Sequence, residues 1–162
     1  VHTWGDVARS QDVASAMKPL LSTLLAVAVD EGRLPGWDAP LAEREPRLRS
    51  LPGGKDARIT WRDLASQTSG YGLEEAPGAA WAYNDYALAL YHDTLFGAVF
   101  AAPADTVLRD RLAAPLGFED RATFAAFGPR DRPGRLALSP RDFARFGLLV
   151  LRAGRWRDRS LL

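Results

Sequence analysis

The chain has 162 residues, 47% apolar and 25% charged, so it is long enough to bury a hydrophobic core and is neither disordered nor fibrous. Its 21 basic and 20 acidic residues nearly cancel, which argues against a nucleic-acid-binding surface or a polybasic membrane patch. The absence of cysteine excludes disulfides, thiolate metal sites and a cysteine nucleophile, and is compatible with either redox compartment. His2 and His92 are too few for a histidine metal cluster unless carboxylates supply the other ligands, and the sequence implies no metal and no cofactor.

No stretch reaches the roughly 18 consecutive apolar residues that span a bilayer. The longest apolar region, residues 20–29, is interrupted by Ser22 and Thr23. It is preceded by too little basic charge, and followed by no small-residue cleavage site, to resemble a signal peptide. We therefore expect no membrane span and no targeting segment, and the compartment stays open. Because the chain begins at Val1, we expect either upstream processing or an excerpt of a longer protein.

The first half of the chain predicts two helices separated by a loop. Apolar residues recur at three- and four-residue spacing over residues 15–32, which predicts a helix that is buried on most sides. Residues 35–55 are rich in proline and glycine and predict a long loop. Residues 59–61 predict a short strand. Thr60 then resembles an N-cap, with Asp63 three residues later, for a short helix that stops at Gly70.

The second half predicts three more helices. Residues 70–78 form a loop, and residues 84–100 predict a helix whose core face is formed by Leu88, Leu90, Tyr91, Leu95 and Val99. A short helix over residues 106–114 is closed by Pro115 and Gly117. The last helix begins at the cap Ser139, where Asp142 completes the capping box, and runs to Gly154 with Phe143, Phe146, Leu149 and Val150 facing the core.

Ser15 and Lys18 are three positions apart, which in a helix places both side chains on one face. A serine hydroxyl becomes a nucleophile when a neighbouring base takes its proton, and a buried lysine can be that base. The apolar sequence around Lys18 supplies the burial, and the start of a helix directs backbone N–H groups at a bound group. These residues also permit a plain reading, with Ser15 as an N-cap and Lys18 as a surface side chain.

Four segments in order resemble the serine β-lactamase and penicillin-binding-protein superfamily. Residues 12–18 and 28–34 resemble its nucleophile helix, which carries Ser-x-x-Lys. Residues 59–70 resemble the segment that ends in Thr-Ser-Gly, and residues 81–86 resemble the place where class C enzymes and related esterases carry Tyr-x-Asn. Residues 116–117 and 139–147 resemble segments near the end of the helical region.

This resemblance implies an α+β fold of the β-lactamase/transpeptidase type, present here mostly as its helical part. It also implies that Ser15 is the acylated nucleophile, that Lys18 is its proton partner and that Tyr83 transfers a proton to the leaving group. We read His92 as a packed or surface residue.

The resemblance is imperfect at Asp85, where the superfamily carries asparagine. An asparagine amide accepts a hydrogen bond from the lysine and donates one to a substrate carbonyl, whereas a carboxylate only accepts. Asp85 near Lys18 would form an ion pair, favour the charged ammonium and shift proton transfer toward Tyr83. Loss of the amide donor weakens recognition of acylamino side chains, which β-lactams and peptides carry, and so favours simple esters.

The superfamily's third motif, Lys/His-Thr/Ser-Gly on a site-lining strand, does not follow Leu162. That strand normally supplies an oxyanion-hole N–H, which is worth roughly 3 kcal/mol. We therefore expect residues 1–162 to form a single, incomplete domain that self-associates or is poorly stable, and that hydrolyses esters at least about a hundredfold more slowly than an extended chain.

Three hypotheses follow. The first is a serine hydrolase that forms an acyl-enzyme on an ester, β-lactam or peptide-like small molecule, with an esterase favoured over a β-lactamase or D-alanyl-D-alanine peptidase. The second is a non-catalytic remnant or binding module of the same fold. The third, an unrelated helical interaction domain, requires the four ordered segments to be coincidental.

Overall fold

The computed structural model describes residues 4–126 and 133–161, so His2 lies outside the described residues. The chain divides into two compact units, one formed by Val1–Val27 with Ala102–Leu162 and the other by Ala28–Ala101. Within the described ranges no helix is long and apolar enough to cross a bilayer.

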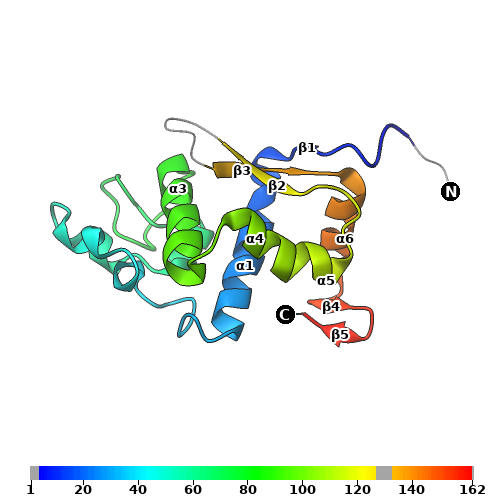
Figure 1. The fold of residues 1–162 in the computed structure, drawn as a ribbon. Helices are drawn as coiled ribbons and strands as arrows, with labels where there is room; N and C mark the ends of the chain where they lie inside the picture. The colour runs from blue at the N-terminus through cyan, green and yellow to red at the C-terminus, as the bar shows by residue number, and fades with distance from the viewer. Residues whose placement is uncertain (1–3, 127–132, 162) are drawn as a thin grey trace. The chain divides into compact units, whose positions relative to one another are not determined.

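The first unit contains a three-stranded antiparallel sheet. Figure 1 shows β3 (Pro133–Leu138) between β1 (Gln11–Asp12) and β2 (Thr123–Ala126). Leu136 and Leu138 are both buried, as expected for alternate positions on one face of a strand. Neither β2 nor β3 is predicted from the sequence, because neither carries a long run of β-branched or aromatic residues.

The segment expected to be one helix from residue 15 begins differently. Residues Ala14–Met17 form a 3₁₀ turn, η1, and α1 follows as Lys18–Asp30. Pro19 lies in the first turn of α1, where its missing N–H has no cost. The predicted burial is confirmed: Leu20, Leu21, Leu24, Leu25 and Ala28 are all at most 1% exposed. Gly32, with φ +68°, follows the end of the helix.

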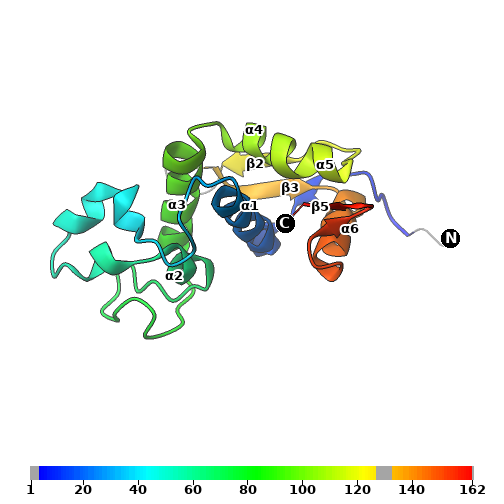
Figure 2. The same ribbon diagram turned by 90° about the horizontal axis from the view of Figure 1, so that it is seen from below.

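A second helical run in the first unit consists of α4 (Ala104–Leu108), the π-helical η6 (Arg109–Ala113) and α5 (Ala114–Leu116). Figure 2 shows this run beside β2. Pro115 does not close the helix, contrary to the sequence-based expectation, and Gly117 ends it with φ +66°. Proline is tolerated here because the π-helical turn before it already interrupts the regular hydrogen-bond ladder.

The last helix, α6 (Pro140–Leu151), begins after the cap Ser139 as expected, and a small hairpin of β4 (Arg155–Trp156) and β5 (Arg159–Ser160) follows it. Phe146 and Leu149 are buried, but Val150 is 57% exposed, so its predicted core position is wrong. The buried face of α6 also includes Asp142, so the centre of this face is displaced away from Val150. Val150 therefore lies at the edge of the face and is exposed to solvent.

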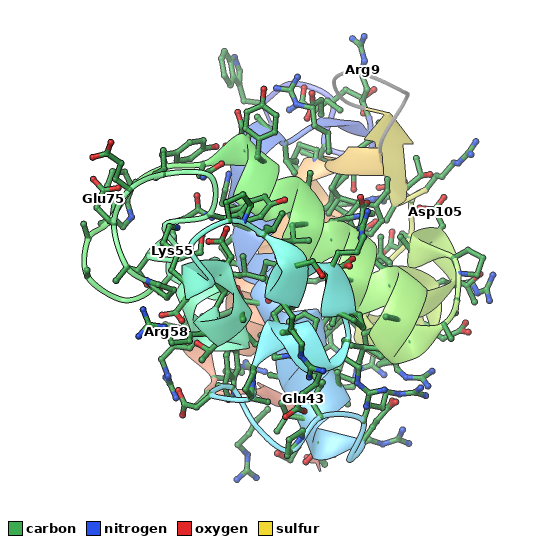
Figure 3. The ribbon with its side chains drawn as sticks, turned by 90° about the vertical axis from the view of Figure 1, so that its left-hand side faces the viewer. Arg9, Glu43, Lys55, Arg58, Glu75 and Asp105 are labelled. Atoms are coloured by element: carbon green, nitrogen blue, oxygen red, sulfur yellow. The ribbon has the colours of Figure 1, made fainter. Side chains whose placement is uncertain are left out.

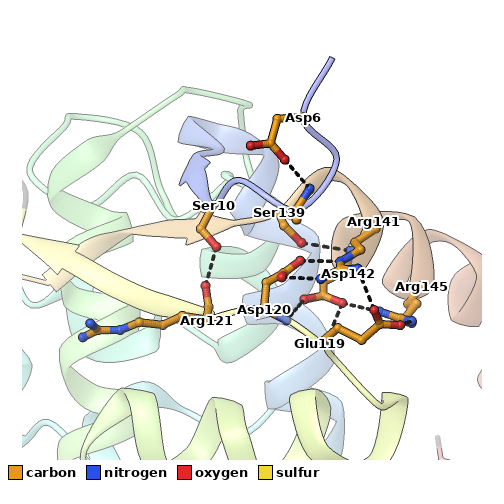
Figure 4. A network of polar contacts seen from close by, with 10 residues as sticks. Asp6, Ser10, Glu119, Asp120, Arg121, Ser139, Arg141, Asp142 and Arg145 are labelled. Atoms are coloured by element: carbon orange, nitrogen blue, oxygen red, sulfur yellow. Dashed lines mark hydrogen bonds and ion pairs between the residues drawn. The ribbon is translucent and has the colours of Figure 1, made fainter. Parts of the chain in front are cut away.

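A network of charged groups joins the start of α6 to the turn before β2 (Figure 4). The buried carboxylate of Asp142 accepts the backbone N–H groups of Glu119 and Asp120 and pairs with Arg145. Arg141 binds both oxygens of Asp120, and Arg141 and Arg145 also pair with Glu119. Ser139 caps the Asp142 N–H, but the Asp142 side chain does not return the bond as the expected capping box requires, because its oxygens bind the turn instead.

The second unit contains α2 (Trp61–Ala65) and α3 (Asp85–Thr94), which continues as the π-helical η5 (Leu95–Phe100). The expected core face of this helix is confirmed, since Leu88, Leu90, Tyr91, Leu95 and Val99 are all buried. Trp61 of α2 and Tyr91 of α3 meet edge to face, with ring centroids 6.0 Å apart. The expected loop over residues 35–55 is built from the short 3₁₀ turns η2 (Leu41–Glu43), η3 (Pro46–Ser50) and η4 (Lys55–Arg58).

The predicted strand at residues 59–61 is wrong, because only an isolated bridge joins Thr60 to Pro40. The predicted capping box at Thr60 is confirmed and explains the difference. Asp63 accepts the Thr60 N–H at 2.9 Å, and Trp61 already belongs to α2. The extended segment is therefore too short to form a strand that pairs with a neighbour.

The loop over residues 70–78 leads from α2 toward α3. Lys55 anchors its start by donating to the carbonyl oxygen of Gly70 at 2.7 Å, and Figure 3 shows Lys55 beside the loop that carries Glu75. Gly70 has φ +60°, and a Cβ there would lie 2.3 Å from the carbonyl oxygen of Glu75. Only glycine fits this position, and the loop closes as Gly78 donates to Thr68 at 2.8 Å.

Candidate active site

Ser15 lies in the 3₁₀ turn that connects the edge strand β1 to α1. Ser15 is exposed, whereas Met17 in the same turn is buried, so the turn presents the hydroxyl to solvent while its other end is fixed in the core. Ala14, immediately before Ser15, has φ +48°, a left-handed conformation that costs a non-glycine residue about 1–2 kcal/mol. The backbone next to the candidate nucleophile is therefore strained.

Three contacts hold this strained turn in place. The carboxylate of Asp12 accepts the Ala14 N–H at 2.7 Å, and its other oxygen lies 3.0 Å from Nε of Arg135 on β3. Val13 donates its N–H to the carbonyl oxygen of Leu136 at 2.9 Å, which continues the pairing of β1 with β3. The position of Ser15 thus depends on the sheet.

Lys18 is the first residue of α1, and its Nζ donates a hydrogen bond to Ser15 Oγ at 2.9 Å. Lys18 is half-buried. The sequence spacing predicts this proximity, although the two residues share a 3₁₀ turn followed by the start of an α-helix rather than one regular helix. A neutral lysine amine at this distance is within reach of the serine proton.

Tyr83 lies in the second unit, in the segment that leads into α3, and is 50% exposed. Its neighbours are fixed on both sides: Ala82 donates its N–H to the carbonyl oxygen of Gln67 at 2.9 Å, and Asn84 donates its N–H to Gln67 Oε1 at 3.0 Å. The Tyr83 phenol is presented from a backbone that is held at both adjacent residues.

Asn84 and Asp85 have different places at the start of α3. Asn84 is the N-cap of α3, and its side-chain oxygen accepts the N–H groups of Tyr86 and Ala87. Its side-chain amide donates to the backbone carbonyl oxygen of Tyr71 at 2.7 Å. The Asn84 amide therefore serves the fold and does not replace the asparagine absent at position 85. Asp85 is exposed in the first turn of α3, where a carboxylate is favoured by the helix dipole. Its ion pair with Lys18 stays a prediction.

The structure thus brings Ser15 and Lys18 together in the first unit, and it places Tyr83 and Asp85 two residues apart in the second. His92 is 3% exposed, with its ring 4.6 Å from that of Phe96, as expected for a packed histidine. Burial lowers the pKa of His92.

Sequence reasoning missed two residues that hold the candidate site, Asp12 and Gln67. An aspartate two positions before Ala14 is a typical Asx-turn signal and could have indicated the first of them. No local signal indicates this role of Gln67, because the two residues that it holds beside Tyr83, Ala82 and Asn84, are 15 and 17 positions away in the sequence.

Solved structures with the same fold cover nearly the whole chain. A candidate beta-lactamase from Bacteroides dorei covers 99% of it with a TM-score of 0.78 at 22% identity. A class C beta lactamase from Rhodobacter sphaeroides covers 94% with a TM-score of 0.69 at 20% identity. An octameric penicillin-binding protein homologue from Pyrococcus abyssi covers 98% with a TM-score of 0.74 at 15% identity. The chain spans 56%, 54% and 47% of these proteins.

These likenesses show the fold: the chain has the α+β fold of β-lactamases and transpeptidases, with few strands among the described residues, as expected from the sequence. The sequence profile of the family described as Beta-lactamase matches residues 11–160, so the chain belongs to the beta-lactamase family. No curated protein sequence matches the chain.

Proposed function

We propose that the chain is part of a serine hydrolase that forms an acyl-enzyme at Ser15. The observation that carries this proposal is the 2.9 Å contact between Lys18 Nζ and Ser15 Oγ, at an exposed serine on a strained turn. Family membership adds support, because hydrolase chemistry through Ser-x-x-Lys is typical of these enzymes.

The reaction divides into two steps. Ser15 Oγ attacks the substrate carbonyl while its proton passes to the neutral amine of Lys18, and Tyr83 donates a proton to the leaving group as the carbonyl–leaving group bond breaks. Water then attacks the Ser15 ester and gives its proton to the Tyr83 phenolate, and Lys18 returns its proton to Ser15 Oγ as the carboxylic acid leaves. Each step needs a group beside Ser15 that accepts a proton and returns it, and Lys18 is placed to be this group.

Simple esters are the substrates that we favour over β-lactams and peptides. Asp85 presents a carboxylate where an amide donor would recognise an acylamino group, and the Asn84 amide is engaged at the cap of α3. One structural relative is a D-stereospecific amidohydrolase from Streptomyces sp., at 17% identity, so the fold also accommodates amide hydrolysis. Self-association stays a prediction, and the octameric Pyrococcus abyssi relative is the comparison that favours it.

Intact-mass spectrometry after exposure to a fluorophosphonate tests the proposal. We expect one adduct, mapped to Ser15 and abolished by Ser15→Ala. The matched control is Ser66→Ala, since Ser66 is also exposed and its hydroxyl donates to the carbonyl oxygen of Arg62. Lys18→Met is expected to slow labelling by roughly 100-fold. An adduct on another serine, or none, contradicts the proposal and favours the non-catalytic binding module.

A further inference from the structure

Gln67 is a buried glutamine with an unusual backbone. It is 8% exposed and has φ +60°, a left-handed conformation that a glutamine adopts at a cost. Such strain persists only where the surroundings fix it. The flanking backbone is fixed, because the Gln67 N–H donates to the carbonyl oxygen of Leu64 at 3.2 Å and the Thr68 N–H donates to that of Asp63 at 2.8 Å.

The two acceptor oxygens of Gln67 hold the residues on either side of Tyr83. The backbone carbonyl accepts the Ala82 N–H at 2.9 Å, and Oε1 of the side chain accepts the Asn84 N–H at 3.0 Å. The side-chain amide donates in turn to Leu64 at 3.3 Å, which orients the oxygen toward Asn84. One residue thus binds the chain at positions i−1 and i+1 relative to the tyrosine.

This arrangement decides where the tyrosine points. In extended backbone, successive side chains lie on opposite sides, and Asn84 has extended dihedral angles. Ala82 and Asn84 are half-buried, whereas Trp81 and Tyr83 are 69% and 50% exposed. The two bonds to Gln67 therefore fix the alternation that turns the Tyr83 phenol outward.

We propose that Gln67 is the positioning residue for Tyr83, holding its phenol for proton transfer through the bonds to Ala82 and Asn84. The inference rests on the proposed function. The Asn84 side-chain oxygen caps α3 by accepting the N–H groups of Tyr86 and Ala87, so Gln67 Oε1 is the acceptor that fixes the Asn84 backbone N–H itself. The left-handed backbone aims both oxygens at the same short segment.

Two substitutions separate positioning from folding. Gln67→Ala and Gln67→Gly both remove the bond to Asn84, but glycine adopts φ +60° without strain, so Gln67→Gly retains more stability. We expect both variants to lower kcat for p-nitrophenyl acetate by roughly 10-fold, with KM changed less than about 2-fold, because a misplaced proton donor impairs the transition state. Amide hydrogen exchange at Asn84 should accelerate in both. Ser66→Ala, at the adjacent position, is the matched control and should change neither quantity.

A double-mutant cycle with Tyr83→Phe provides the readout that a purely structural role would not move. If Gln67 acts through the phenol, Gln67→Gly has no further effect on kcat in the Tyr83→Phe background. A full additional loss in that background, or an unchanged kcat in both single variants, overturns the role of Gln67. A wild-type chain that neither hydrolyses the ester nor is labelled at Ser15 instead contradicts the proposed function and, with it, this role.

Discussion

The carboxylate of Asp142 accepts the backbone N–H of Asp120 at 2.9 Å, although the two residues are 22 positions apart. The same side chain is fully buried, accepts the Glu119 N–H at 3.0 Å and lies 2.5 Å from Nη1 of Arg145. One carboxylate therefore joins α6 to the turn that precedes β2 and so supports the sheet on which Ser15 depends.

Asp142→Ala should lower the free energy of unfolding by about 3 kcal/mol, since it leaves two partly buried backbone donors and one guanidinium without their acceptor. Urea denaturation followed by circular dichroism measures this. Asp110→Ala is the control, because Asp110 pairs with Arg109 at the surface, and it should leave the midpoint nearly unchanged. Equal effects of the two substitutions would contradict the role given to Asp142.

Stability should also depend on Asp120 at low pH. Hydrogen bonds from Arg141, and then from the Ser139 hydroxyl, lower the pKa of Asp120 from 3.8 to about 2. Because the folded pKa lies below the unfolded one, the stabilisation is present above about pH 4 and is lost as the pH falls toward 2. Asp120→Asn should therefore flatten the decline in urea midpoint across this window. Parallel curves for wild type and variant between pH 4 and 2 would exclude the contribution.

Asp12 should control the reactivity of Ser15. Asp12→Ala removes the acceptor of the Ala14 N–H, so the left-handed conformation of Ala14 relaxes and fluorophosphonate labelling of Ser15 slows by roughly 10-fold. Asp12→Asn keeps an acceptor oxygen and should retain most of the rate. Adding Ala14→Gly to Asp12→Ala should restore part of it, because glycine adopts positive φ freely. Equal losses in Asp12→Asn and Asp12→Ala would point to charge instead of turn geometry.

Asp85→Asn should raise the ratio of kcat/KM for a β-lactam to that for a simple ester. The amide restores a donor for the acylamino carbonyl and removes the carboxylate that we expect to favour the charged form of Lys18. Nitrocefin and p-nitrophenyl acetate hydrolysis measure the two values. An unchanged or lower ratio would refute this explanation of Asp85, and Asp93→Asn, an exposed position on the same helix, is the control.

Features whose partners lie within about one helical turn of each other can be predicted from the sequence. The Thr60–Asp63 capping box, the Ser139 cap and the contact between Ser15 and Lys18 each join residues three positions apart, so local spacing is sufficient to predict them. The buried face of α3 follows in the same way from helical periodicity.

Features that join distant segments depend on the packing of the whole fold. Gln67 accepts a hydrogen bond from Asn84, 17 positions away, and Asp142 accepts one from Asp120, 22 positions away. No local pattern specifies such partners. The same limit explains why Asp142 was expected to close a capping box and why Val150 was expected in the core. A polar side chain or a helix face adopts one of several locally acceptable arrangements, and the packing of remote elements selects among them because it determines which groups lose water.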